Sequence, residues 1–166
     1  MNDVKKGSPT ETLDLEYCDP SSIQTIVSAI FYTETRHYLL QLRDNKPALP
    51  LPNHWALFGG NLELNESPED CLIREINEEL EYKIKKYYWY HSAIYALPKH
   101  KHKIVRKIYF VVKITSDEIL SMNLREGAAM KAHSLEEILQ LKNVSPWDAG
   151  VIMMHERHNT VFSYTN

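Results

Sequence analysis

The segment from Ser67 to Glu81 constrains the fold more than any other part of the chain, because its ends and its periodicity both predict a helix. Ser67 is a favourable N-cap, Pro68 suits the first helical position, and Asp70 lies three residues after the cap. Apolar residues recur within it at i, i+4 and i+8, at Leu72, Ile76 and Leu80. The segment therefore predicts a helix that ends at Leu80 or Glu81 and buries one apolar stripe.

Segments with the composition of strands surround this helix. Apolar, β-branched and aromatic residues fill 26–32, 38–43, 55–58, 83–96 and 104–114. Residues 44–53 hold three prolines, which predicts a long loop. Further helices are expected over 116–122, 134–141 and 145–157, the last two opened by serine caps. We expect residues 125–133 to form a loop and a strand, and the whole to be one mixed α/β domain with antiparallel strands.

Composition limits the class of protein and its partners. The chain has 166 residues, 43% of them hydrophobic and 25% charged, which is typical of one globular domain. No run approaches the roughly 18–20 apolar residues of a membrane helix, so we expect no membrane partner. The net charge of −3 argues against a nucleic-acid partner. Residues 1–22 are polar and are expected to form a tail or edge segment before a domain over 23–166.

Two cysteines, Cys18 and Cys71, lie far apart in the sequence. Two thiols form neither a dense disulfide scaffold nor a four-cysteine zinc site. The first residues contain no apolar stretch of the kind that opens a secretory signal. We therefore expect a reduced, cytoplasmic protein, with Cys71 as a small core residue of the helix rather than a nucleophile.

Three glutamates gather on one face of the predicted helix. Glu75, Glu78 and Glu79 lie at i, i+3 and i+4, where their repulsion costs on the order of a few tenths of a kcal/mol per pair. Arg74 can pair with Glu78 or with Glu66, but at least two negative charges remain. A solvated acidic surface is one interpretation. A bound divalent cation such as Mg²⁺ or Mn²⁺, which prefers oxygen ligands, is the other.

The spacing around these glutamates favours the second interpretation. It resembles the Nudix hydrolase signature, G-x5-E-x7-R-E-U-x-E-E-x-G-U, where U is an aliphatic residue. Seven of its nine fixed positions match, at Gly60, Glu66, Arg74, Glu75, Ile76, Glu78 and Glu79. Glu81 and Tyr82 replace the final glycine and aliphatic residue. A glutamate accepts the left-handed turn that glycine provides only at a cost of about 1 kcal/mol, so we expect the helix to end differently or to extend by a residue.

The resemblance implies a Nudix-type α/β/α sandwich with a mixed sheet and a loop-helix-loop motif. It implies metal ligands at Glu75, Glu78 and Glu79, joined by the carbonyl of Gly60, with Mg²⁺ or Mn²⁺ as cofactor. Arg74 and Glu66 would form an ion pair that orients the loop and the helix. Glu79 or Glu75 would be a possible general base. The resemblance does not indicate which residues bind the substrate.

The implied reaction is hydrolysis of a nucleoside diphosphate linked to another moiety, which yields a nucleoside monophosphate and a phosphorylated remainder. NDP-sugars and (d)NTPs are the first substrates to test. The alternatives are a catalytically silent nucleotide-binding sensor on the same scaffold and an interaction domain with a fortuitous acidic helix. Retention of all three glutamates argues against both. A homodimer is possible only by analogy with the family.

Two features outside the signature stay open. Glu126, next to Gly127, either completes the metal site or is an ordinary turn glutamate. The basic run at 99–107 either attracts polyphosphate near the mouth of the site or forms a solvated hairpin turn. His155 and His158 are one residue too close for the H-E-x-x-H zinc motif, so we do not assign a zinc site there.

Overall fold

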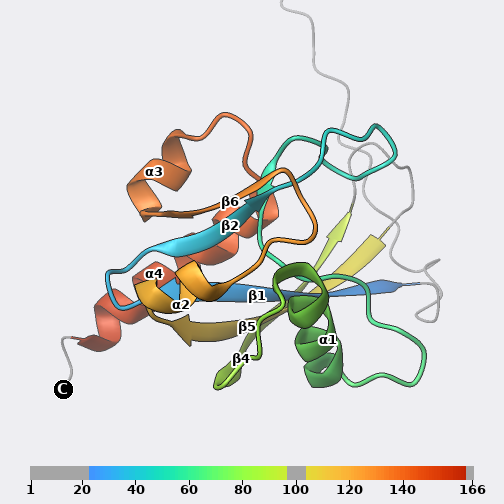
Figure 1. Ribbon diagram of the computed structural model, residues 1–166, viewed down its shortest axis with the longest axis horizontal. Helices are drawn as coiled ribbons and strands as arrows, with labels where there is room; N and C mark the ends of the chain where they lie inside the picture. Colours follow the sequence, from blue (N-terminus) through green and yellow to red (C-terminus); the bar gives the residue numbers. More distant parts are fainter. Residues whose placement is uncertain (1–22, 97–103, 164–166) are drawn as a thin grey trace, which may run out of the picture.

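The computed structural model describes residues 23–96 and 104–163 and places a six-stranded mixed sheet between helices (Figure 1). Its elements are β1 (Gln24–Thr33), β2 (Tyr38–Leu42), β3 (Trp55–Ala56), α1 (Pro68–Leu80), β4 (Tyr87–Ala96), β5 (Ile104–Ile114), α2 (Ser116–Ser121), β6 (Ala129–His133), α3 (Leu135–Gln140) and α4 (Pro146–Ser163). The strand order is β3-β2-β1-β5-β4, with β6 on β2. Among the named strand pairs of the described residues, β1–β5 is parallel and the other four are antiparallel. The expected tail at 1–22 lies outside the described residues.

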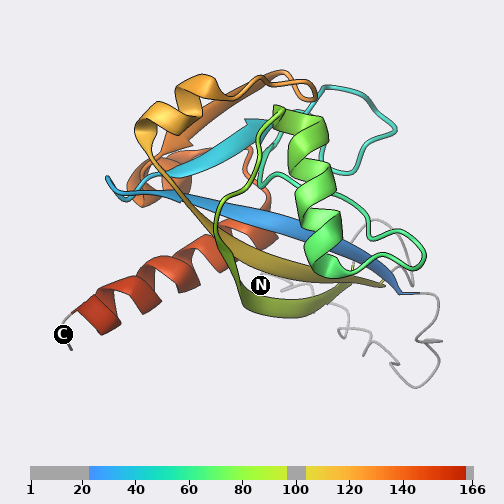
Figure 2. The ribbon, with the colours of Figure 1, turned by 60° about the horizontal axis from the view of Figure 1, so that its bottom comes forward.

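Two apolar layers cover the two faces of the sheet. Helices α1 and α2 cover one face, where Leu72 and Ile76 meet Phe31 and Phe110 of the sheet. Helices α3 and α4 cover the other, where Ile138 and Ile152 join the core. Figure 2 shows α1 and α4 on opposite sides of β1 and β5. The α/β/α sandwich predicted from the sequence is confirmed.

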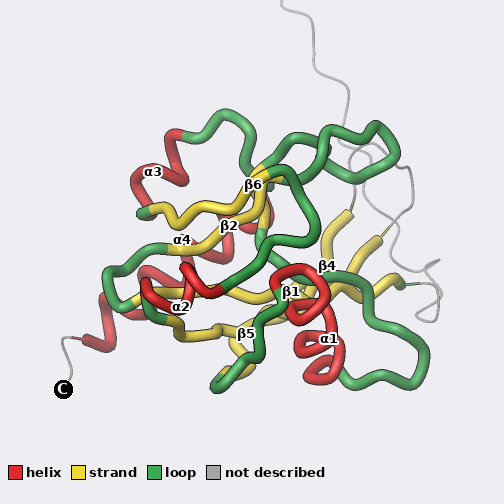
Figure 3. The backbone as a smooth tube through the Cα atoms, in the orientation of Figure 1, coloured by secondary structure: helices red, strands yellow, loops and turns green. Residues whose placement is uncertain are grey.

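A short segment enters the sheet where β1 and β2 part. These strands pair only near their shared turn, through Phe31–Leu39 and Tyr32–Tyr38. Beyond that point, residues 55–61 lie between the two strands: Ala56 pairs with β2, and Phe58 bridges to Ala29 of β1. The loops on either side of this segment form the long green path between β2 and α1 in Figure 3. The inserted segment thereby brings the two glycines that follow Phe58 alongside β1.

The expected strand at 83–96 begins later than predicted. Residues 81–86 are a loop, because the chain turns at Glu81 and then directs Tyr82 and Ile84 into the core beneath α1. Pairing with β5 starts only at Tyr87, opposite Val112. Of the predicted strand 55–58, only residues 55–56 are regular strand. The three later helices are confirmed, and α4 continues beyond Arg157 to Ser163.

Of the basic run, the structure describes residues 104–107, which belong to β5; Arg106 is exposed and Lys107 is buried. Residues 99–103 lie outside the described part. Lys107 is buried in β5, and its Nζ lies 2.5 Å from Oδ1 of Asp148, also buried, at the start of α4. Oδ2 of Asp148 accepts a hydrogen bond from the backbone of Leu57. Lys107 therefore joins the sheet to α4 and is neither a solvated turn residue nor an exposed attractor of phosphate.

No helix in the described part of the chain combines the length and apolar character needed to cross a membrane.

His155 is the most deeply buried histidine of α4 and faces the sheet. Its ring lies against Tyr32, Tyr38 and Tyr90, and the hydroxyl of Tyr38 is 3.0 Å from its Nδ1. Only 1% of its surface is exposed. Burial lowers the pKa of His155 from 6.5 to about 4. The folded protein thus holds this imidazole neutral at pH values where an exposed imidazole is protonated.

We predict that His155 makes folding sensitive to acid. Because its folded pKa lies below its unfolded pKa, its contribution is complete above pH 6.5 and is lost as the pH falls towards 4. His155→Phe should remove on the order of 2–3 kcal/mol of that pH dependence. Urea unfolding of both proteins at several pH values between 7.5 and 4 measures it. Equal pH dependence in the two proteins would contradict the prediction.

Candidate functional site: an acidic face on helix α1

Helix α1 is positioned by the local signals that predicted it. The side chain of Ser67 accepts a hydrogen bond from the backbone N–H of Asp70, and Pro68 occupies the first turn. Cys71 and the apolar stripe are fully buried against the sheet. Burial raises the pKa of the Cys71 thiol to about 12, as expected of a core cysteine. With this stripe held inward, Glu75 lies beside Gly60 and Glu79 accepts a hydrogen bond from Gly59, in the loop at residues 59–66.

Arg74 connects this loop to the helix. Its Nε lies 2.8 Å and its Nη2 3.0 Å from the carboxylate oxygens of Glu66, so the predicted ion pair is present and bidentate. Nη2 also donates to the backbone carbonyl of Asn61. Nη1 lies 2.8 Å from Glu75 and 3.3 Å from Glu78. The hydrogen bonds from Arg74 hold the pKa of Glu66 down at about 2.

Glu79 is the deepest glutamate of the face, with 6% of its surface exposed. Its Oε1 accepts a hydrogen bond of 2.9 Å from Nε2 of Gln41, and its Oε2 accepts one of 2.7 Å from the N–H of Gly59. Burial raises the pKa of Glu79 to about 7. Gln41 is absent from the site residues predicted from the sequence; a glutamine within the apolar run of β2 indicates a buried polar partner without identifying it.

Two glycines allow the inserted segment to pass between β1 and the glutamates. Gly59 has φ 127°, and a Cβ there would lie 2.1 Å from the carbonyl oxygen of Val27. A Cβ on Gly60 would lie 2.3 Å from the carboxylate of Glu75. The carbonyl of Gly60, the predicted ligand, already accepts a 2.8 Å hydrogen bond from the N–H of Val27. A metal there would have to share this oxygen with the sheet.

The loop that carries Glu126 packs against the same site. Arg125 donates its N–H to the carbonyl of Glu79, and Ala128 donates to Leu42 of β2. Gly127, with φ 91°, permits this approach. Glu126 itself is exposed; burial is the main cause that raises the pKa of Glu75 and Glu79, and the charge of Glu126 adds to it. The structure therefore brings Glu126 into electrostatic reach of the acidic face.

The carboxylates differ in depth and in their partners. The side chain of Glu78 is 55% exposed and that of Glu75 is 15% exposed, whereas Glu79 is bound from behind by the sheet. Within residues 23–96 and 104–163, no three acidic, histidine or cysteine side chains converge in a ready metal cluster. The donor chemistry nevertheless fits a hard divalent cation, because every candidate is an oxygen and the missing Cβ of Gly60 leaves the approach to Glu75 free.

Glu81 ends α1 in the conformation that was expected to be avoided. It lies at φ 49°, in the left-handed region, and donates its N–H to the carbonyl of Asn77. Asn123 donates to its carboxylate at 2.7 Å, and Arg125 lies 3.3 Å from it. The expectation of a different or longer helix end is therefore wrong. The loop that contains Asn123 and Arg125 supplies the compensating contacts.

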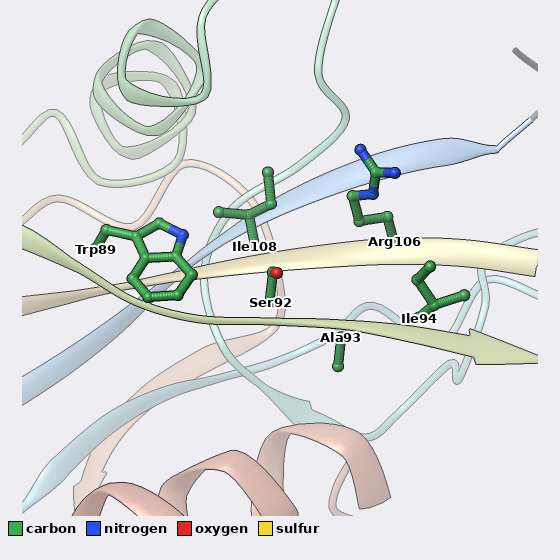
Figure 4. Close-up of a pocket in the computed structure, with 6 residues that line it drawn as sticks. All are labelled: Trp89, Ser92, Ala93, Ile94, Arg106 and Ile108. Atoms are coloured by element: carbon green, nitrogen blue, oxygen red, sulfur yellow. The ribbon is translucent and has the colours of Figure 1, made fainter. Parts of the chain in front are cut away.

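Two surface hollows lie elsewhere, over β4 and β5. One, of about 540 Å³, is shown in Figure 4 and is lined by Trp89, Ser92, Ala93, Ile94, Arg106 and Ile108. The other, of about 650 Å³, is lined by Lys85, Lys86, Tyr87, Tyr88, Val111, Lys113 and Glu118. None of the carboxylates discussed above lines either hollow. Both hollows are therefore separate from the acidic face.

Comparison with known families decides what kind of scaffold carries this face. The NUDIX domain family matches residues 22–154, which is most of the chain. The chain belongs to the Nudix hydrolase family. The fold of the chain agrees with this assignment. The resemblance inferred from the signature is confirmed.

Individual Nudix relatives are distant. Nucleoside triphosphatase NudI of Escherichia fergusonii is 39% identical over 57 residues, which are 34% of this chain and only 39% of that protein. The MutT protein of Methanosarcina mazei Go1 has a TM-score of 0.70 at 22% identity, covering 82% of this chain and 95% of its own. The Nudix domain of Shewanella oneidensis NrtR, solved with ADP-ribose, has a TM-score of 0.68 at 17% identity, covering 90% and 98%. These structures share the fold.

We predict that Arg74→Ala lowers stability, because it removes the cation that contacts Glu66, Glu75 and Glu78. The melting temperature should fall on the order of 5 °C, and the loop at residues 59–66 should lose protection from hydrogen exchange. Arg157→Ala, at an exposed position of α4, is the control and should be nearly neutral. An unchanged melting temperature in Arg74→Ala would argue that the ion pairs contribute little.

A second prediction concerns the left-handed turn at Glu81. Glu81→Gly and Glu81→Ala both lose the contacts with Asn123 and Arg125, but only glycine removes the backbone cost. The glycine variant should therefore be about 1 kcal/mol more stable than the alanine variant. Urea unfolding at neutral pH measures the difference. Equal stability of the two variants would show that the turn is not strained.

Proposed function

We propose that this Nudix protein hydrolyses a nucleoside diphosphate linked to another moiety, in a reaction that depends on Mg²⁺ or Mn²⁺. The products are a nucleoside monophosphate and a phosphorylated remainder. NDP-sugars and (d)NTPs are the first candidates for the substrate. The name of the relative NudI, a nucleoside triphosphatase, and the ADP-ribose bound to NrtR both support a nucleotide-linked substrate.

The observation that carries the proposal is the excess of carboxylates over cations around α1. Arg74 is shared among Glu66, Glu75 and Glu78, while the carboxylate of Glu79 has an amide and a backbone N–H as its partners. Holding so many negative charges together is unfavourable without further cations. Clusters of carboxylates of this kind bind a divalent cation together with the phosphate of a substrate.

We assign the metal-holding role to Glu75, Glu78 and Glu79, with Glu126 as a further candidate from its loop. When bound, a divalent cation neutralises phosphate charge and makes a coordinated water easier to deprotonate. Glu79 is held by Gln41 and by Gly59 so that both of its oxygens have a defined direction. Glu75, which lies beside Gly60, or Glu79, which accepts a hydrogen bond from Gly59, would accept the proton of the attacking water.

Arg74 and Glu66 are assigned a positioning role. Their bidentate ion pair fixes the loop at residues 59–66 against α1, which sets the distance between Gly60 and Glu75. This arrangement pre-organises the carboxylates before any ligand arrives. The proposal favours an enzyme over a silent nucleotide sensor, because a sensor would not need three acidic residues that repel one another.

A panel of nucleotides tests the proposal. NDP-sugars, ADP-ribose and (d)NTPs are incubated with the full chain and Mg²⁺ or Mn²⁺, and the phosphate-containing products are identified. We expect release of a nucleoside monophosphate from at least one of them, abolished by EDTA and restored by added metal. Nucleotide binding without any product, in the presence of either metal, would instead support the sensor.

We predict that Glu78→Gln lowers kcat by at least ~10²-fold and leaves the melting temperature within a few degrees of the original. Glu78 is half-exposed, so its loss removes a metal ligand and not core packing. Glu136→Gln, on the exposed side of α3, is the matched control and should keep full activity. If Glu78→Gln were as active as the unmodified protein, the assignment of Glu78 as a metal ligand would be wrong.

A further inference from the structure

We propose that Gln41 is a positioning residue of the site, whose side-chain amide aims the carboxylate of Glu79 at the bound cation. This inference rests on the proposed function and names a residue that lies outside the Nudix signature. Gln41 is in β2, far in sequence from α1, and is 3% exposed. Its Nε2 lies 2.9 Å from Oε1 of Glu79.

The surroundings of Gln41 explain why its amide is oriented. Nε2 also lies 3.5 Å from the carbonyl of Leu57, in the inserted segment just before the two glycines. On the other side, a Cβ on Gly127 would come within 3.0 Å of Oε1 of Gln41. One side chain of β2 therefore touches α1, the inserted segment and the loop that carries Glu126. A buried amide with neighbours in three elements has little freedom to rotate.

The hydrogen bond to Glu79 determines which lone pairs of the carboxylate stay free. Gly59 donates to Oε2 and Gln41 donates to Oε1, so the carboxylate is fixed at both oxygens from the sheet side. No cationic side chain in the described ranges pairs with Glu79, so no ion pair competes for its orientation. Partners of this kind set ligand orientation, and their loss usually weakens metal affinity or activity by about 10–100-fold.

Two substitutions of similar size separate positioning from packing. Gln41→Met keeps the length of the side chain and removes the donor. Gln41→Glu keeps the shape and places an acceptor oxygen against Glu79. Thr33→Val is the control, because Thr33 is equally buried in β1 and its hydroxyl accepts a hydrogen bond from the N–H of His37, away from the site.

The readouts are the affinity for Mn²⁺ alone, measured by calorimetry on the substrate-free chain, and then kcat and KM for the best nucleotide. We expect Gln41→Met to weaken Mn²⁺ binding by about 10-fold or more and to lower kcat, with KM nearly unchanged. The loss should be larger in Gln41→Glu. Thr33→Val should lower the melting temperature and leave Mn²⁺ affinity and kcat unchanged.

A folded Gln41→Met protein with unaltered Mn²⁺ affinity and kcat would overturn the inference. Mn²⁺ binding that weakens in the Gln41 variants, in a chain that hydrolyses no nucleotide, would support the role of Gln41 and reject the proposed function. Normal nucleotide hydrolysis in both Gln41 variants would support the proposed function and reject the role of Gln41. The two proposals therefore fail separately.

A measurement on the unmodified chain covers the case in which the variants do not fold. The side-chain amide resonances of Gln41 are followed by NMR while Mg²⁺ is added. We expect them to shift in step with metal occupancy, whereas the amide resonances of Gln140, exposed at the end of α3, should stay in place. Gln41 resonances that do not respond to saturating Mg²⁺ would overturn the inference.

Discussion

The close passage of backbone at Gly59 and Gly60 is the constraint on which the site depends. The inserted segment fills the gap that opens between β1 and β2. A Cβ at Gly59 would clash with the backbone of Val27, and a Cβ at Gly60 would displace the carboxylate of Glu75. Because this segment also donates from Gly59 to Glu79, one stretch of main chain links the sheet to the acidic helix. The geometry of the glutamates is therefore a property of the sheet as much as of α1.

The helix tolerates its charges because they are distributed among different environments. Arg74 takes up part of the negative charge near the loop, the sheet solvates Glu79 with an amide and an N–H, and Glu78 stays close to water. Burial of Glu79 still has a cost, which appears as the raised pKa of its carboxyl group. Such a cost is typical of residues kept for chemistry and not for stability.

The parts of the fold that were predictable from sequence are those with local causes. The Ser67 cap, the apolar stripe of α1 and the Arg74–Glu66 pair all depend on residues within one loop and one helix, and each is present. The roles of Gln41 and Lys107 depend on partners 38 and 41 residues away, which no local pattern reveals. A polar residue in an apolar strand indicates that it has a polar partner but does not identify that partner.

The end of α1 has a consequence for how such proteins are recognised. The signature has glycine at this place because the backbone there adopts a left-handed conformation. Glu81 adopts the same conformation, and a loop more than forty residues further along the chain contacts its side chain. Sequence patterns that insist on glycine would reject this chain while its backbone follows the required path. In relatives that lack this glycine, we expect an amide or guanidinium group from outside the motif to contact the residue that replaces it.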